Sequence, residues 1–366
     1  MEKKKKQGFW AKKGRKKILG AILFILLNAV VIAITATSEF GNSKNATELS
    51  EVKINWWLIL PAVLCFMVAV LFEIFKYVLM IRRLSIEEKL PRNEIKTIHK
   101  NSWKIASRTV LLGKYYDNIT PAAIGGQPFQ IYYMRRNSGL SNGASTSTPI
   151  VGMIANQIGF LIIAILCFLF TGIAWSNPAL AVTAWIGLLF YAFWPVMIAG
   201  ISFFPKATTK FLKIIIKILA KIKIVKNREA ALDKIEHEMT EYAKSVKMIL
   251  KSKGLFLRVI VLSVLFNALV ATIPFFVLTA FGGNVGFIEC FALTIAVMSA
   301  VYFVPTPGNA GAAEGTFFLV FSALSTGYVF WAMLFWRFFS YYIYIIMGLI
   351  IYFIMQIEKR RARASE

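Results

Sequence analysis

Residues 120–136 read TPAAIGGQPFQIYYMRR and interrupt an otherwise largely apolar stretch of the chain. Two prolines and two glycines fall within eight positions, 121–128, and an α-helix does not continue through such a sequence. The residues from Trp103 to Tyr116 precede this break, and a short aromatic segment that ends on two arginines follows it. The pattern predicts a helix, a break and a second helix over about 102–139.

A second break has the same character. Residues 304–315 read VPTPGNAGAAEG and separate two apolar arms within about 287–326. The glycine-rich loop and the arm after it are too short to cross a bilayer, which requires about 20 residues. Non-helical backbone at membrane depth is tolerated only where protein or a water-filled cavity satisfies its polar groups. We therefore expect 102–139 and 287–326 to be re-entrant hairpins that line a cavity, with packing kinks or short loops between full crossings as the alternative.

Hydrophobic residues make up 58% of the 366-residue chain, above the share of about 45–50% in soluble domains. Apolar stretches long enough for a membrane helix lie at 18–37, 56–81, 146–171, 178–203, 256–281 and 328–356. The predicted fold class is an all-α polytopic membrane protein with about six full transmembrane helices and two re-entrant hairpins. A cleavable signal peptide is the alternative interpretation of 18–37.

The charged residues are unevenly placed, with 42 Lys and Arg against 18 Asp and Glu. The basic segments are 1–17, 82–104, 205–255 and 357–366, whereas 38–55, 172–177 and 282–287 have few basic residues or none. Basic loops stay on the cytoplasmic side. This predicts basic cytoplasmic tails at 1–17 and 357–366 around a transmembrane domain at 18–356, with both termini inside. The spacing within 205–255 predicts an amphipathic helical hairpin on anionic lipid.

Ionisable residues inside apolar segments need partners. Glu73 and Lys76 lie three positions apart in one span, so we expect an ion pair near the inner interface with the Lys76 ammonium reaching toward water. Arg337 lies deep in the last span, and Glu314 in the second break is its nearest candidate partner by depth. Interhelical hydrogen bonds are expected from Asn156, Gln157 and Asn267, with the lining of a path as the alternative.

Several classes of site are missing from the sequence. The three cysteines lie in apolar runs and the two histidines lie in charged stretches. This leaves no disulfide framework, no zinc-ligand spacing and no His-based triad. The sequence also has no P-loop for a nucleotide. We therefore predict no catalytic residue, no metal, no cofactor and no direct binding of nucleic acid.

The two breaks together resemble the lysylphosphatidylglycerol synthase transmembrane family, which is flippase-like, and the first is similar to the form found in its Firmicutes branch. The similarity extends over nearly the whole chain in the order and spacing of the spans. It implies a multi-pass protein of the bacterial plasma membrane that handles phosphatidylglycerol or lysyl-phosphatidylglycerol and contributes to resistance to cationic antimicrobial peptides. Residues 155–157, Ala-Asn-Gln, depart from the charged residues that many relatives carry there, so the head group could differ.

Half-helix N-termini after the breaks favour anionic groups such as phosphate. With the resemblance, this assigns a path for the lipid head group in which Gly125, Gly126 and Gln127 accept its phosphate. Arg135 and Arg136 are expected to attract anionic lipid at the cytoplasmic mouth, and Glu314 to counter a cationic head group or a nearby arginine. The other expected path residues are Pro121, Pro128, Gln130, Pro305, Pro307, Gly308, Gly311 and Arg337.

The family's larger members carry a cytoplasmic domain that transfers lysine from charged tRNA to phosphatidylglycerol, and we expect none in this chain, which stops at Glu366. The leading hypothesis is a lipid flippase without a catalytic domain. One alternative is a phosphatidylglycerol lysyltransferase, or its membrane subunit acting with a separate soluble catalytic partner. Another is a non-transporting scaffold that docks a partner on residues 228–251. A homodimer through the apolar spans is also compatible with the sequence.

Overall fold

The structure is a computed structural model that describes residues 54–123, 125–172, 178–203, 252–302, 304–322 and 328–364, with isolated residues between 210 and 249. These residues are helical almost throughout, as predicted, and no strand occurs among them. The predicted first span 18–37, the basic tail 1–17 and most of the predicted amphipathic hairpin 205–255 lie outside the described residues.

The long helices follow the predicted spans. They are α2 (Trp56–Glu87), α5 (Asn142–Phe170), α7 (Pro178–Phe203), α10 (Lys253–Ala280), α13 (Val329–Arg337) and α14 (Ile343–Ala364), and a π-helical turn, η4 (Phe338–Tyr342), joins the last two. Four helical segments are long and apolar enough to cross a membrane, namely α2, α5, α10 and the continuous stretch Val329–Ala362. The apolar part of α7, Pro178–Phe193, is shorter by the same measure.

Helix α2 extends beyond the predicted end of its span. The apolar stretch finishes near residue 81, yet the helix continues to Glu87, where the side chain pairs with Arg83. An ion pair between positions i and i+4 supports a helix at its charged end. At the other end, the side-chain oxygen of Asn55 accepts a hydrogen bond from the backbone N–H of Trp57 and caps the helix.

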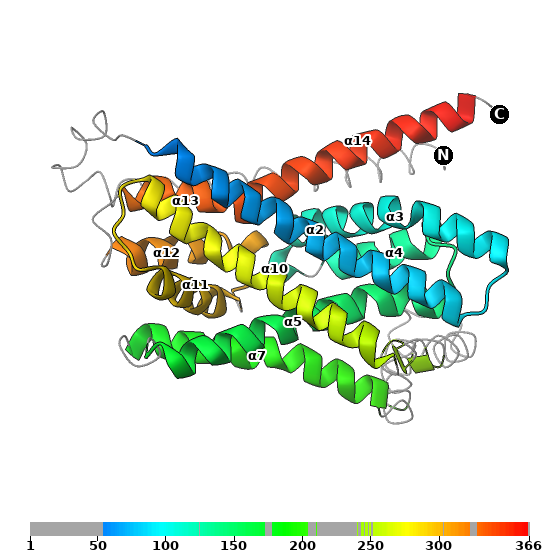
Figure 1. The fold of residues 1–366 in the computed structure, drawn as a ribbon, viewed down its shortest axis with the longest axis horizontal. Coiled ribbons are helices and arrows are strands. Elements are labelled where there is room, and N and C mark those ends of the chain that lie inside the picture. The colour runs from blue at the N-terminus through cyan, green and yellow to red at the C-terminus, as the bar shows by residue number, and fades with distance from the viewer. Residues whose placement is uncertain are drawn as a thin grey trace, which may run out of the picture.

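Both predicted helix–break–helix segments are present. The first hairpin consists of α3 (Arg92–Ile119), a 3-10 turn η2 (Pro121–Ala123) and α4 (Gly126–Asn137). The second hairpin consists of α11 (Phe287–Val301), a 3-10 turn η3 (Pro307–Asn309) and α12 (Ala312–Ser322). In Figure 1 the first hairpin occupies the half of the bundle where α2 ends, and the second occupies the opposite half. The two hairpins meet tip to tip, because η2 packs against η3.

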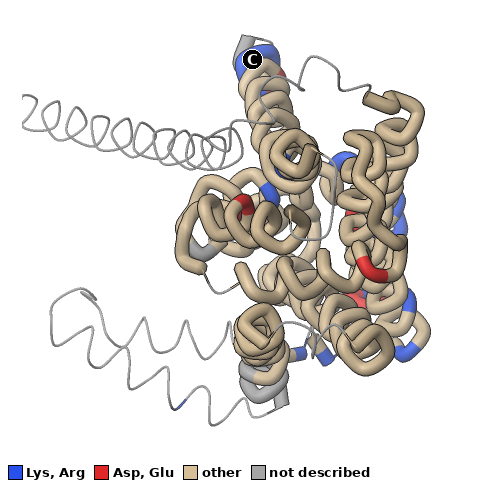
Figure 2. The backbone as a smooth tube through the Cα atoms, turned by 90° about the vertical axis from the view of Figure 1, so that its left-hand side faces the viewer, with Lys and Arg blue, Asp and Glu red and all other residues tan. Residues whose placement is uncertain are grey.

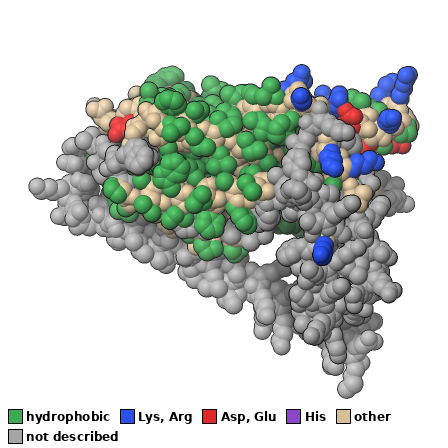
Figure 3. Space-filling view, turned by 90° about the horizontal axis from the view of Figure 1, so that it is seen from below, with side chains coloured by type: hydrophobic (Ala, Val, Ile, Leu, Met, Phe, Trp, Pro, Cys, Tyr) green, Lys and Arg blue, Asp and Glu red, His purple; other side chains and the backbone are tan. Residues whose placement is uncertain are grey.

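The surface of the bundle is apolar. Figure 3 shows hydrophobic side chains over much of one face, with Lys and Arg gathered at one end. Figure 2 shows few charged positions along the described parts of the helices. Large exposed apolar side chains lie on the long helices, for example Leu64 on α2, Leu169 on α5 and Leu189 on α7. Contiguous exposed apolar surface of this kind marks an interaction site, and a lipid bilayer is the natural partner for a belt that surrounds long helices.

Small residues let neighbouring helices approach closely. A side chain on Gly187 in α7 would collide with the backbone carbonyl of Ser299 in α11. A Cβ atom on Gly159 in α5 would lie 2.8 Å from the backbone carbonyl carbon of Ser263 in α10. Because membrane helices gain little from burying apolar surface against each other, close backbone packing is their main source of stability. The first arm of the second hairpin is therefore packed backbone to backbone against α7.

Candidate functional site

The first break is closed by the side chains of Asp117 in α3 and of Thr120, the residue that follows α3. The hydroxyl oxygen of Thr120 accepts a hydrogen bond from the backbone N–H of Gly125 at 2.9 Å. The carboxylate of Asp117 accepts one from the backbone N–H of Gly126, also at 2.9 Å. A side chain on Gly126 would collide with Asp117, and one on Gly125 would press on Thr120, so the glycines make room for these caps.

These caps correct one expectation. Gly125, Gly126 and Gln127 were expected to accept a phosphate at the N-terminus of α4, but the N–H groups of Gly125 and Gly126 are already donated within the protein. The physical reason is that the unpaired donors at a helix N-terminus are usually satisfied by nearby oxygen side chains when the helix end is buried. The role of Gln127 stays a prediction. Sequence patterns describe the break well, but they do not show which neighbouring side chains fold back onto it.

Four other expected residues of the first hairpin lie in η2 and the first turns of α4. Pro121 opens η2 and is exposed, as is Pro128 in the first turn of α4, and Gln127 beside it is half-buried. Gln130 is buried and accepts a hydrogen bond from the hydroxyl of Tyr77 in α2, with a donor–acceptor distance of 3.3 Å. The first turns of α4 therefore contact α2.

Arg135 and Arg136 lie at the end of α4 that is distant from the break. Both are exposed. The Arg135 guanidinium donates two hydrogen bonds to the hydroxyl of Thr146, and Arg136 donates one to the hydroxyl of Tyr132 at 2.6 Å. The two arginines therefore belong to the surface end of the first hairpin, where a cytoplasmic mouth was expected.

The second break is locked by a buried ion pair. The Arg337 guanidinium lies 2.7 Å from the Glu314 carboxylate, and both side chains are about 95% or more buried. This confirms the expected pairing of the two residues. The second oxygen of Glu314 accepts a hydrogen bond from the N–H of Gly311, and Arg337 donates another to the carbonyl of Gly308. With both oxygens engaged, Glu314 acts as the partner of an arginine, one of the two roles that the sequence suggested.

The prolines and glycines of the second break shape its turn. Pro305 is exposed in the loop, and Pro307 starts η3, where its fixed φ suits the first helical position. Gly308 has φ +58°, and a side chain there would collide with the Tyr341 ring; Gly311 has φ +90°. Both glycines adopt left-handed backbone conformations that other residues seldom adopt.

The tips of the two hairpins are tied together through the last span. The side-chain amide of Asn118, next to the first break, donates a hydrogen bond to the carbonyl of Tyr341 at 3.3 Å. In return the Tyr341 hydroxyl donates to the carbonyl of Asn118 at 3.4 Å. The guanidinium of Arg337 lies 4.6 Å from the centre of the Tyr341 ring. Residues from both breaks therefore meet on the π-helical turn η4.

A second buried polar cluster surrounds Lys76. Its ammonium lies 2.8 Å from Glu73, as predicted, and it also donates to the side chain of Asn156 and to the carbonyl of Gly152 in α5, and to Ser263 in α10. The expected reach of Lys76 toward water is wrong, because its side chain is fully buried and neighbouring helices supply the acceptors.

Three amides make the interhelical hydrogen bonds that the sequence predicted. Asn156 in α5 donates to Glu73 in α2 at 2.9 Å. Asn267 in α10 donates to the backbone carbonyl of Asn156 at 3.1 Å. Gln157 donates to the hydroxyl of Tyr302, which follows α11, at 2.9 Å. These bonds link α2, α5, α10 and the second hairpin at the centre of the bundle.

Two charged residues beside the first break were not among the predicted site residues. Lys114 and Asp117 lie in the last turns of α3, and each is partly exposed. Asp117 caps α4, and the Lys114 ammonium lies 5.3 Å from the centre of the Phe266 ring of α10. Their signal in the sequence is weak but present, since they are charged positions just before a helix break in a mostly apolar arm.

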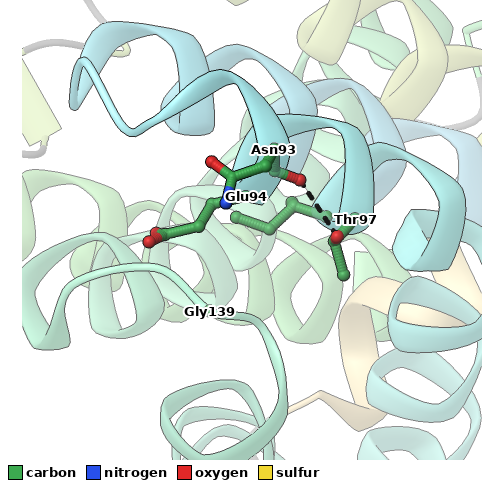
Figure 4. Close-up of a pocket in the computed structure, with 5 residues that line it drawn as sticks. Asn93, Glu94, Thr97 and Gly139 are labelled. Carbon is green, nitrogen blue, oxygen red and sulfur yellow. Dashed lines mark hydrogen bonds between the residues drawn. The ribbon is translucent and has the colours of Figure 1, made fainter.

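A pocket also opens far from both breaks. It has a volume of about 360 Å³ and is lined by Asn93, Glu94, Thr97, Ile98 and Gly139, at the start of α3 and the link between α4 and α5 (Figure 4). None of the predicted site residues lines it. Among the described residues there is also no group of His, Cys, Asp and Glu arranged to hold a metal ion.

Comparison with known proteins identifies the family. Residues 18–348 match the family described as lysylphosphatidylglycerol synthase TM region. The chain belongs to this family. The matched range includes both hairpins and Arg337, so the resemblance inferred from the two breaks is confirmed, while the assignment to the Firmicutes branch stays a prediction. Searches of curated proteins and of solved structures gave no match. Together with the apolar helices, the family assignment makes this a multi-pass membrane protein.

Proposed function

We propose that this family member is a phospholipid flippase of the bacterial plasma membrane. It would move phosphatidylglycerol or lysyl-phosphatidylglycerol between the leaflets and so contribute to resistance to cationic antimicrobial peptides. The observation that carries the proposal is the contact between η2 and η3, the turns of the two helix breaks. Broken helices that meet at the membrane midplane are the usual framework of substrate sites in secondary transporters.

The proposal places the membrane normal along the long axis of the bundle. The first hairpin then enters from the cytoplasm and returns there, and the second enters from outside and returns outside. Support comes from the charge distribution, since Lys and Arg gather at one end in Figure 3, where α3 begins and α14 ends (Figure 1). Basic residues favour the cytoplasmic side. Both chain termini would be cytoplasmic in this orientation.

Each hairpin would form one half of the path. Arg135 and Arg136 at the surface end of α4 would attract anionic lipid, with a gain of about 1 kcal/mol for each basic residue near the membrane surface. Pro305 and Pro307 would border the outer half. The buried pair of Glu314 and Arg337 would hold the second break in shape, because their hydrogen-bonding groups are engaged within the protein.

The description of the family favours a second candidate function, a membrane subunit of a lysylphosphatidylglycerol synthase that works with a soluble transferase. In that case the purified chain would support formation of lysyl-phosphatidylglycerol from charged tRNA only after the soluble partner is added. The scaffold hypothesis rests on residues 228–251, most of which lie outside the described part of the chain.

Lipid movement in proteoliposomes tests the proposed function. Purified protein is reconstituted with fluorescent phosphatidylglycerol or lysyl-phosphatidylglycerol, and dithionite reports the fraction of label in the outer leaflet over time. Protein-containing vesicles should equilibrate the label faster than protein-free vesicles. The proposal would be overturned if, for each of the two lipids, folded and inserted protein moved the label no faster than protein-free vesicles do.

A matched pair of glycine variants separates the path from general folding. Gly126→Ala places a methyl group against the Asp117 cap at the first break, so we expect slower movement of lipid. Gly315→Ala lies just after the second break, where a Cβ atom meets nothing within 4 Å, and should leave the rate unchanged. Equal rates for the two variants would argue against a role for the first break.

A further inference from the structure

The cations in the interior of the bundle differ in what they contact. Lys76 and Arg337 are buried, and carboxylate, amide, hydroxyl and carbonyl oxygens surround them. Lys114 is partly exposed and forms no hydrogen bond or ion pair with any residue that the structure describes. Its contact is the face of the Phe266 ring, so its three N–H donors remain available to a ligand.

The neighbouring carboxylate is also only partly used. Asp117 lies three residues after Lys114, which places both on one face of α3. One oxygen of Asp117 accepts the N–H of Gly126. The other oxygen has no hydrogen bond from the described part of the chain, and it remains an acceptor. Lys114 and Asp117 therefore present a positive and a negative group together at the tip of the first hairpin.

Residues of α10 and α5 connect this pair to the second hairpin. Lys114 contacts Phe266 in α10. The next residue, Asn267, donates a hydrogen bond to the backbone carbonyl of Asn156, the neighbour of Gln157 in α5. Gln157 donates its amide N–H to the Tyr302 hydroxyl, but its own carbonyl oxygen is buried with no hydrogen-bond donor among the described residues. The Gln157 side chain is 95% buried. Because buried acceptors nearly always have a donor, this oxygen calls for a donor from outside the described residues, and a bound head group can supply one.

We propose that Lys114 binds the phosphodiester of a lipid head group at the meeting point of the two hairpins, while Asp117 and Gln157 accept hydrogen bonds from donors on the same head group. The inference rests on the proposed function and names its central binding site. It replaces Gly125 and Gly126 as the phosphate site, because their N–H groups are occupied. The ligand class is a phosphodiester whose head group carries hydroxyl or ammonium donors.

The chemistry of the site explains why one charge of each sign is present. In an interior of low effective dielectric, the ammonium of Lys114 attracts a phosphodiester more strongly than it would in water. The carboxylate of Asp117 opposes binding of phosphate alone but favours a head group that also carries N–H or O–H donors. A site with both groups therefore selects phosphatidylglycerol or phosphatidylethanolamine over phosphatidylcholine, which has the phosphodiester but no hydrogen-bond donor.

Binding of short-chain lipids to the detergent-solubilised full chain tests this assignment. The probes are the dioctanoyl forms of phosphatidylglycerol, phosphatidylethanolamine and phosphatidylcholine, and the readout is the dissociation constant from thermophoresis. In Lys114→Gln we expect affinity for phosphatidylglycerol to fall about tenfold or more, which is about 1.4 kcal/mol. Lys114→Arg should stay within about threefold of the wild type, since the cation is kept. Phosphatidylcholine should bind the wild type about tenfold more weakly than phosphatidylglycerol.

A surface lysine gives the matched control. Lys244→Gln removes one positive charge from an exposed position and should leave the affinity unchanged. Wild-type affinity in Lys114→Gln, with a normal elution profile, would overturn the site assignment, as would equal losses in Lys114→Gln and Lys244→Gln. Equal binding of phosphatidylcholine and phosphatidylglycerol would overturn the role of the acceptors.

This test is separable from the test of transport. A wild-type chain that binds phosphatidylglycerol through Lys114 but moves no lipid would refute the flippase proposal and keep the binding site. A chain that moves lipid, in which Lys114→Gln has wild-type rate and affinity, would keep the flippase proposal and refute the binding site.

Discussion

The two hairpins have the same architecture but are stabilised in different ways. The second break is fixed by the buried pair of Glu314 and Arg337, which also engages the backbone of Gly308 and Gly311. The first break is closed by hydrogen bonds that the backbone N–H groups of Gly125 and Gly126 donate to Thr120 and Asp117. Removing one partner of a buried ion pair lowers the free energy of unfolding by much more than removing a helix cap does. We therefore expect the second hairpin to be harder to open than the first.

The two hairpins also differ in how they contact the last span, through a buried residue in one case and an exposed residue in the other. Arg337 in α13 reaches the second hairpin inside the bundle. The first hairpin reaches α14 through Arg108, whose guanidinium donates two hydrogen bonds to the carboxylate of Glu358, and through Lys104 at 3.1 Å from the same carboxylate. The Glu358 side chain is 44% exposed. Exposed ion pairs contribute little to stability because water and salt screen them.

The largest expected effect is on the buried pair. Arg337→Met leaves the Glu314 carboxylate buried without its cation, so we expect a loss of about 3–5 kcal/mol in the free energy of unfolding. Thermal unfolding of the purified protein in detergent measures the change. The double variant Glu314→Gln with Arg337→Met removes both charges and should lose less. A single variant that is as stable as the double variant would remove the distinction between the two hairpins.

Next in size is the backbone strain at the tip of the second hairpin. Gly308→Ala forces an L residue into φ +58° and presses its methyl group on Tyr341, so we expect a loss of about 1–3 kcal/mol. Gly315→Ala in α12 is the matched control, and it should be neutral or slightly stabilising because alanine favours a helix. Equal unfolding temperatures for the two variants would contradict this account of the turn.

The helix cap in the first hairpin should contribute less to stability than the turn at Gly308. Asp117→Ala leaves the N–H of Gly126 without its acceptor, and we expect a loss of about 0.5–2 kcal/mol. Hydrogen exchange at the start of α4 should increase in this variant. Asp117→Asn keeps a side-chain oxygen in the same place and should retain most of the protection. If exchange does not respond to Asp117→Ala, the cap does not hold the break closed.

The smallest effect is expected at the surface link. Glu358→Gln weakens the contacts with Arg108 and Lys104, and we expect a change of at most about 1 kcal/mol. The difference from the wild type should shrink further at high salt. A large, salt-independent loss of stability would mean that the first hairpin depends on α14 as strongly as the second depends on Arg337.

Sequence reasoning found the parts of the fold that local chemistry determines. Prolines and glycines located both breaks, apolar length located the spans from residue 56 onward, and membrane depth alone brought Glu314 and Arg337 together. Helix breakers act where they occur in the chain, and an arginine at membrane depth needs a carboxylate, a carbonyl or water beside it. The number of full crossings and the orientation in the membrane remain proposals.

Tertiary contacts decided what the sequence could not. The burial of Lys76 depends on acceptors from α5 and α10, which lie far from it in the chain. The caps at Gly125 and Gly126 depend on how sharply α3 and α4 fold against each other. The neighbours of Lys114 in α10 and α5 are likewise set by the tertiary fold and not by the sequence around it. Each of these features requires knowledge of which helices are neighbours.

The π-helical turn Phe338–Tyr342 sets the rotational phase of the last helix. A π turn holds one more residue than an α turn, and each residue of an α-helix accounts for about 100° of rotation. The turn thereby lets one continuous helix point Arg337 at the second hairpin and Glu358 at the first. Removing one residue from the turn would rotate α14 by about 100° and carry Glu358 away from Arg108. The number of residues in the π turn therefore determines the angle between Arg337 and Glu358 around the helix axis. Only with the present length can this one helix contact both hairpins.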